Sequence, residues 1–189
     1  MKKKPLVFTK HDPRTDEIRL DLGTGTGIHK PDGFIGVDLV PHRAVDRVVD
    51  MRKPWPWKSE SVAEANCHYV MHYFTAAERV HVVNELWRVL KPGAKTVIVT
   101  PHEFASKAYG DLRVQWPPVA EAWYLTLNKA FRESEPYLKT CGYACDFDFT
   151  LGYGLHPGLV SRNQEYQQHA VTFWKEAAQD LCVTLVKRP

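Results

Sequence analysis

The sequence predicts a single α/β domain built on a mostly parallel sheet of seven strands. Strand-like and helix-like segments alternate after residue 16, and residues 95–100 are β-branched and nearly continuous, as expected of a buried central strand. Such alternation is typical of parallel sheets. Two further strand-like segments close the chain, and they predict an antiparallel strand near the C-terminus.

Length and composition are those of one folded domain. The chain has 189 residues, of which 44% are hydrophobic and 25% charged. We expect residues 1–16 to be a flexible lead-in and residues 17–189 to form the domain.

Several classes of protein are disfavoured by what the sequence lacks. No apolar run approaches the roughly 18 residues of a membrane span, and no apolar signal segment follows the basic start, so we expect a cytoplasmic protein without a membrane partner. A net charge of +3 does not require a nucleic-acid partner. The four cysteines form no Cys-x-x-Cys pair, so we expect no metal site.

Nine elements are predicted from local patterns. The strands are residues 18–22, 34–39, 45–49, 62–66, 95–100, 144–151 and 181–187. A helix is predicted to begin at the capping box Thr75-Ala76-Ala77-Glu78 and to end at Lys91-Pro92-Gly93, where proline and glycine stop it. A second helix is predicted over residues 119–131.

A glycine-rich turn, Asp21-Leu22-Gly23-Thr24-Gly25-Thr26-Gly27, directly follows the first predicted strand. Glycines let a backbone approach a ligand without obstruction by side chains. Several kinds of nucleotide-binding fold use such a turn, and a purely structural turn is the alternative.

Asp38 ends the second predicted strand and sharpens this interpretation. A carboxylate there can accept hydrogen bonds from both hydroxyls of a ribose, as in dinucleotide-binding proteins. A pyrophosphate, however, is stabilised by the N-terminus of a helix that follows the glycines. Only five residues separate Gly27 from Gly33, and Pro31 lies among them, so any helix there is about one turn long. S-adenosylmethionine (SAM) carries no phosphate, so the short connection favours SAM over NAD.

Asp50 and Met51 follow the third predicted strand. The carboxylate can accept a hydrogen bond from an adenine amino group, and the thioether can pack on the ring. An ordinary capping aspartate is the alternative, and these two residues alone do not decide between them.

Four stretches, residues 20–27, 33–39, 50–65 and 84–102, together resemble the class I SAM-dependent methyltransferases, in particular short bacterial and phage forms. The resemblance implies a Rossmann-like fold and SAM as cofactor. It implies that Asp38, with Leu39 beside it, holds the ribose, and that Asp50 and Met51 hold the adenine. The methionine portion is assigned by the same resemblance to Asp21, Gly23, Thr24, Gly25 and Gly27.

Two departures from the family pattern carry expectations of their own. Met71 stands where relatives often have a glutamate. We therefore expect that cofactor binding in this protein does not need an acid at this position. The helix after the glycines is nearly absent, so we expect one side of the sheet to be poorly covered unless a dimer partner covers it.

Histidines are the candidates for a general base, because they titrate near neutrality. His102 follows the fifth predicted strand and ranks first, and His68, after the fourth, ranks second. A structural role is an equal alternative for each. Asn66-Cys67-His68-Tyr69 also invites comparison with the Asn-Pro-Pro-Tyr motif of nucleic-acid amino-methyltransferases, but it lacks both prolines.

Asp111, Arg113 and Trp116 follow the fifth predicted strand, where the family builds its acceptor wall. Arg113 can pair with an acidic acceptor, and Trp116 can stack on a ring. Packing of the tryptophan against the sheet is the favoured alternative.

The sequence thus predicts a methyltransferase that transfers a methyl group from SAM to an oxygen or nitrogen of an unidentified acceptor. The acceptor is a small molecule in preference to a nucleic acid, and the protein is a monomer or a homodimer. The alternatives are a SAM-binding protein without transferase activity and, less favoured, an NAD-dependent oxidoreductase.

Overall fold

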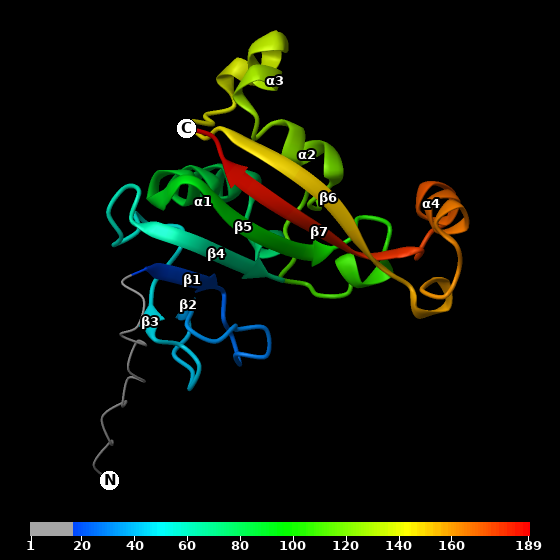
Figure 1. The fold of residues 1–189 in the computed structure, drawn as a ribbon, viewed down its shortest axis with the longest axis horizontal. Helices are drawn as coiled ribbons and strands as arrows, with labels where there is room; N and C mark the ends of the chain where they lie inside the picture. The colour runs from blue at the N-terminus through cyan, green and yellow to red at the C-terminus, as the bar shows by residue number, and fades with distance from the viewer. Residues whose placement is uncertain (1–16) are drawn as a thin grey trace.

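The computed structural model describes residues 17–189, so the lead-in predicted over residues 1–16 lies outside the described residues. Seven strands form one sheet in the order β3-β2-β1-β4-β5-β7-β6 (Figure 1). The strands are β1 (Ile18–Leu22), β2 (Ile35–Asp38), β3 (Arg47–Val48), β4 (Val62–His68), β5 (Leu90–Pro101), β6 (Phe147–Leu155) and β7 (Ala178–Lys187). The helices are α1 (Ala76–Val89), α2 (Glu121–Leu125), α3 (Lys129–Ser134) and α4 (Gln164–Phe173).

Strand directions confirm the predicted fold class. The neighbours from β3 to β5 are all parallel, whereas β7 is antiparallel to both β5 and β6. The carboxyl ends of the parallel strands therefore meet at one edge of the sheet, where ligands of such folds bind. β6 ends at the same edge, and α4 projects beyond it (Figure 1).

The start of α1 is confirmed, and the helix ends at Val89, just before the predicted stop, but the segment that follows differs from the prediction. The Thr75 hydroxyl accepts a hydrogen bond from the Glu78 backbone N–H, and the Glu78 carboxylate accepts one from the Thr75 backbone N–H at 2.8 Å. At the other end, Leu90 is already extended (φ −65°, ψ 141°) and pairs with Val62 of β4. Lys91-Pro92-Gly93 therefore belongs to β5, which begins five residues before its predicted start at residue 95.

The single helix predicted over residues 119–131 is wrong. Two short helices, α2 and α3, occupy this stretch and its continuation. The side chain of Asn128 accepts a hydrogen bond from the Phe131 backbone N–H and caps a new helix there. The third predicted strand, residues 45–49, shortens to Arg47–Val48, which is the exposed edge strand β3.

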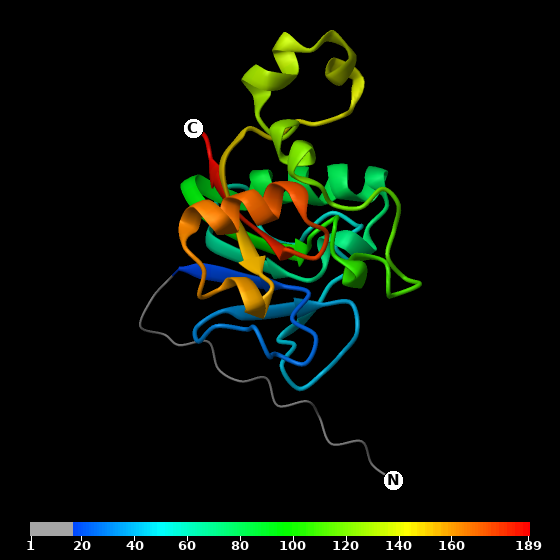
Figure 2. The same cartoon turned by 90° about the vertical axis from the view of Figure 1, so that its right-hand side faces the viewer.

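One face of the sheet carries the hydrophobic core. Leu20 of β1, Ile98 of β5 and Leu185 of β7 are fully buried in one cluster with Leu86 of α1 and Tyr124 of α2. The connections from β1 to β2 and from β2 to β3 contain turns and loops in place of helices. Within residues 17–189, no helix covers β4, β5 and β7 on the side opposite α1 (Figures 1 and 2). This agrees with the expectation of a poorly covered side. None of the helices in residues 17–189 has the length and apolar character needed to cross a membrane.

Candidate functional site

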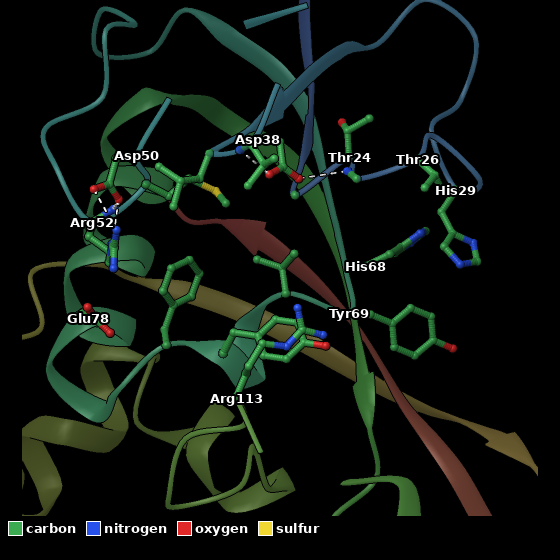
Figure 3. Close-up of a pocket in the computed structure, with 18 of the residues that line it drawn as sticks. Thr24, Thr26, His29, Asp38, Asp50, Arg52, His68, Tyr69, Glu78 and Arg113 are labelled. Atoms are coloured by element: carbon green, nitrogen blue, oxygen red, sulfur yellow. Dashed lines mark hydrogen bonds and ion pairs between the residues drawn. The ribbon is translucent and has the colours of Figure 1, made fainter. Parts of the chain in front are cut away.

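A pocket of about 650 Å³ lies at the carboxyl ends of β1, β2 and β4 (Figure 3). Asp50 lies at one end, Asp38 near the middle and His68 toward the other end. Seven of the nine residues predicted to hold the cofactor line it: Gly23, Thr24, Gly25, Asp38, Leu39, Asp50 and Met51. Asp21 and Gly27 do not line it.

The three glycines of the turn have different reasons to be glycine. All have positive φ: 72° at Gly23, 51° at Gly25 and 85° at Gly27. A Cβ on Gly23 would lie 1.9 Å from a methyl carbon of Val70, and one on Gly27 would lie 2.5 Å from the Cβ of Ala44. A Cβ on Gly25 would meet only the carbonyl oxygen of Gly23, at 3.9 Å. Gly23 and Gly27 thus allow the protein to pack on itself, and Gly25 keeps the backbone open toward the pocket.

Asp21 lies beneath the turn and is only 2% exposed. The Thr24 hydroxyl donates to the Asp21 carboxylate at 2.8 Å and accepts from the Val37 backbone N–H at 3.1 Å. Burial raises the pKa of Asp21, and the hydrogen bond from Thr24 opposes that rise. Asp21 therefore holds the turn in place through Thr24.

Asp38 lies in the middle of the pocket with both oxygens directed by the backbone. One oxygen accepts from the Gly25 N–H at 2.9 Å and the other from the Val40 N–H at 3.0 Å. A carboxylate offers about four acceptor positions, so these bonds leave acceptor capacity for two hydroxyl donors. Leu39, the next residue, is 48% exposed on the pocket wall.

Asp50 is paired with Arg52 at the far end of the pocket. The Arg52 Nε donates to one carboxylate oxygen at 2.8 Å and Nη2 donates to the other at 3.0 Å. These hydrogen bonds hold the pKa of Asp50 below its usual value. Met51 is buried, and its carbonyl oxygen accepts from the Trp55 indole N–H at 3.0 Å. Phe74 lines the same pocket, so the lining combines carboxylates with apolar side chains.

His68, Tyr69 and His29 gather at the opposite end (Figure 3). Tyr69 has φ 57°, a left-handed conformation that is costly for a non-glycine residue and is often found at functional sites. Its N–H donates to the Val99 carbonyl oxygen at 2.7 Å, which ties this conformation to β5. The His29 ring centroid lies 5.4 Å from that of His68 and 5.5 Å from that of Tyr69.

The protonation of this end follows from its surroundings. Burial lowers the pKa of His68, and His29 lowers it further, against the opposing effect of Asp21. Burial also raises the pKa of Tyr69 to about 12, with Asp180 adding to the rise. Near neutral pH, His68 is thus a neutral base and Tyr69 a protonated phenol.

His102, the first-ranked candidate base, lies outside this pocket. It is 2% exposed; its Nδ1 accepts from the Phe104 backbone N–H at 3.2 Å, and its Nε2 lies 3.5 Å from a Glu121 carboxylate oxygen of α2. Met71, which stands in place of the family's glutamate, is also buried in the core. Because His102 does not line the pocket, its catalytic role stays a prediction.

Of the three predicted acceptor residues only Arg113 lines this pocket, although Asp111 pairs with Arg113 and shares a smaller hollow with Trp116. Arg113 lines the pocket, and its Nη2 donates to the Asp111 carboxylate at 2.5 Å. Asp111 lies behind it, where it also accepts from the Tyr73 hydroxyl at 3.1 Å. Trp116 is 78% exposed and lines a smaller neighbouring hollow with Leu112.

Sequence reasoning missed several residues of the pocket, chiefly His29, Arg52 and Phe74. His29 had a usable signal, because it stands two residues after Gly27 in a turn already assigned to the ligand. Phe74 had none, because only the short helical turn Met71–Tyr73 brings it back to the pocket.

Comparison by sequence identifies no relative: no protein-family model and no curated protein matches the chain. Comparison by structure does. A SAM-dependent methyltransferase from Archaeoglobus fulgidus has a TM-score of 0.64 and 15% identity, over 90% of this chain and 86% of that one. A chain from the Haloferax volcanii complex of the methyltransferase activator Trm112 with its methyltransferase has a TM-score of 0.59 and 16% identity, over 92% and 84%. The [4+2]-cyclase SpnF has a TM-score of 0.54 and 16% identity, over 91% and 75%. The chain therefore has the fold of the SAM-dependent methyltransferases.

Proposed function

We propose that this chain is a SAM-dependent methyltransferase with its cofactor in the pocket between Asp50 and His68. One observation carries the proposal: Gly25, Asp38 and Asp50, from three separate segments, line a single pocket at the carboxyl edge of the sheet. SAM, when bound, supplies a methyl group on a positively charged sulfur. An open backbone turn and two carboxylates suit a ligand that has a ribose and an adenine but no phosphate.

Each end of the pocket has a proposed role in holding the cofactor. Asp38 accepts from the ribose hydroxyls with the positions that Gly25 and Val40 leave free. Asp50 accepts from the adenine amino group, while Met51 and Phe74 pack on the ring. The backbone around Gly25 holds the methionine portion, and Asp21 is a positioning residue that acts through Thr24.

His68 is the proposed general base, because it lines the pocket and its lowered pKa keeps it neutral near pH 7. It accepts the proton from a hydroxyl or amine of the acceptor. Tyr69 and His29, whose ring centroids lie 5.5 Å apart, form one wall that excludes water from the acceptor. Arg113, held by Asp111 at the pocket wall, orients an acceptor that carries a negatively charged group.

Two alternatives remain distinct from this proposal. An NAD-dependent oxidoreductase is disfavoured because residues 23–33 form turns, so no helix N-terminus faces the position of a pyrophosphate. A SAM-binding protein without transferase activity has one observation in its support, namely that a [4+2]-cyclase has a similar fold.

The decisive experiment combines binding with group transfer. We expect calorimetric titration to show binding of S-adenosylhomocysteine and none of NAD. We expect methyl-labelled SAM, incubated with fractionated small molecules and RNA from a cell extract, to label a fraction with the wild type but not with Asp38→Ala. Binding without label in any fraction would support the non-transferase alternative, and absence of binding would overturn the proposal.

A further inference from the structure

β6 is an edge strand of the sheet, and only the first residue of its outer edge is hydrogen-bonded to another segment. The Phe147 N–H donates to the Leu127 carbonyl oxygen at 3.1 Å, and the Phe147 carbonyl accepts from the Asn128 side-chain amide at 3.2 Å. The backbone groups of Phe147 therefore point away from β7. Since backbone direction alternates along a strand of an antiparallel pair, the groups two, four and six residues further also point outward.

Those outward residues are Phe149, Leu151 and Tyr153. In the part of the chain that the structure describes, no loop or side chain forms a hydrogen bond with their backbone groups. The pairing of β6 with β7 shifts register after Gly154, so the regular edge ends there. The free stretch thus runs from residue 149 to residue 153, and Leu151 is its centre.

The free stretch carries exposed apolar and aromatic side chains, which favour pairing with another strand. Leu151 and Tyr153 are each 38% exposed, although they stand on the face that carries the core. Natural edge strands are commonly protected by proline, lysine or a bulge, and the free stretch of β6 contains none of these.

We propose that the β6 edges of two copies of this chain pair antiparallel about a twofold axis through Leu151. In that register, Phe149 lies opposite Tyr153 of the second copy and Leu151 lies opposite itself, so aromatic and aliphatic side chains pair on one face. The outward backbone groups of these residues form the hydrogen-bonded pairs of the new ladder.

On the other face of the strand, the same register brings no like charges and no bulky side chains opposite each other. Asp148 lies opposite Gly154 of the second copy, and Thr150 lies opposite Gly152. No like charges face each other, and the glycines leave room for the larger partners. This self-complementarity points to a second copy of the chain as the occupant.

The pairing does not depend on the proposed methyl transfer. The pocket lies over β1, β2 and β4, at the other half of the sheet, so both pockets stay open in the dimer. A strand pair alone buries less than the roughly 1,200 Å² of a standard interface, so we expect a dimer that dissociates on dilution.

Sedimentation equilibrium over a concentration series tests this proposal. The wild type is expected to dimerise as concentration rises, and Leu151→Lys is expected to stay monomeric because it places like charges across the axis. Thr150→Lys is the matched control: it adds the same charge on the other face, opposite a glycine, and is expected to dimerise like the wild type. Thermal melting of both variants checks that they fold.

Disulfide cross-linking tests the register itself. In a Cys141→Ser background, Leu151→Cys places two thiols on residues whose Cα atoms are about 5.5 Å apart, within reach of a disulfide. Diamide, which takes the two thiol hydrogens, is expected to cross-link Leu151→Cys and not the offset Thr150→Cys. A wild type that is monomeric at every concentration, or equal cross-linking of the two variants, overturns the proposal.

Discussion

The carboxylate of Asp38 accepts a hydrogen bond at 2.9 Å from the backbone N–H of Gly25, which joins the end of β2 to the turn after β1 across the pocket. The contact orients the carboxylate before any ligand arrives. We expect Asp38→Ala to weaken S-adenosylhomocysteine binding by about ten- to a hundredfold, because a hydrogen bond to a charged group contributes roughly 1.5–3 kcal/mol. Calorimetric titration measures this change.

The matched control for that variant is Asp32→Ala, which removes a carboxylate from an exposed part of the same β1–β2 connection, outside the pocket lining. It is expected to bind as the wild type does. If Asp38→Ala and the wild type bind S-adenosylhomocysteine with equal affinity, Asp38 does not contribute to cofactor binding.

Gly23 and Gly25 are expected to respond differently to alanine. Gly25→Ala costs roughly 1–2 kcal/mol of stability, because an alanine must adopt positive φ, and its methyl group enters the pocket and weakens ligand binding. Gly23→Ala adds overlap with Val70 to the same backbone cost, so we expect it to destabilise by roughly 2–5 kcal/mol. Urea denaturation and ligand titration of both variants separate the two effects.

A second substitution isolates the packing part of that prediction. Val70→Ala in the Gly23→Ala background removes the overlapping methyl groups and is expected to regain part of the lost stability. If Gly23→Ala is no less stable than Gly25→Ala, the packing role of Gly23 is wrong.

The elements that sequence patterns predicted well are those whose causes are local. The capping box at Thr75 sets the start of α1 by itself, and the β-branched residues of β5 mark a buried strand. The start of β5 was misplaced because pairing of Leu90 with Val62, nearly thirty residues away, outweighs the turn tendency of Lys91-Pro92-Gly93. Such long-range pairing leaves no mark in the local pattern.

The site shows the same division. Asp38 and Asp50 were found because Asp38 ends β2 and Asp50 comes shortly after β3, at the edge where ligands bind. His102 also follows a strand end, yet its side chain turns toward Glu121 on the core side of the sheet. Which side a residue beyond a strand end takes depends on the loop that follows, and here that loop differs for His68 and His102.

His72 is expected to make folding stability depend on pH. Burial, with Arg79 nearby, lowers its pKa from 6.5 to about 4, and its Nδ1 has no hydrogen-bond partner among the described residues. Between these two values the unfolded chain binds the proton and the folded chain does not, so stability falls as pH drops from 6.5 toward 4, by about 3 kcal/mol.

The variant His72→Phe keeps a ring beside Tyr73, whose centroid lies 4.2 Å from that of His72, and removes the titrating group. Its free energy of unfolding, measured in urea at several pH values, is expected to fall less between pH 6.5 and pH 4 than that of the wild type. An unchanged slope would assign the acid sensitivity to other groups.

His68 is expected to set the acidic limb of the pH profile. Its pKa lies below the ordinary 6.5, so it is charged only at more acidic pH and activity falls as pH drops through that lowered value. We expect His68→Gln to lower kcat by about a hundred- to ten-thousandfold, the usual range for a general base, with cofactor affinity little changed. His169→Gln, an exposed histidine on α4, is the control and is expected to keep full activity. Proton NMR titration of the His68 ring gives the pKa without any acceptor, and a value at or above 6.5 would contradict the role assigned to His68.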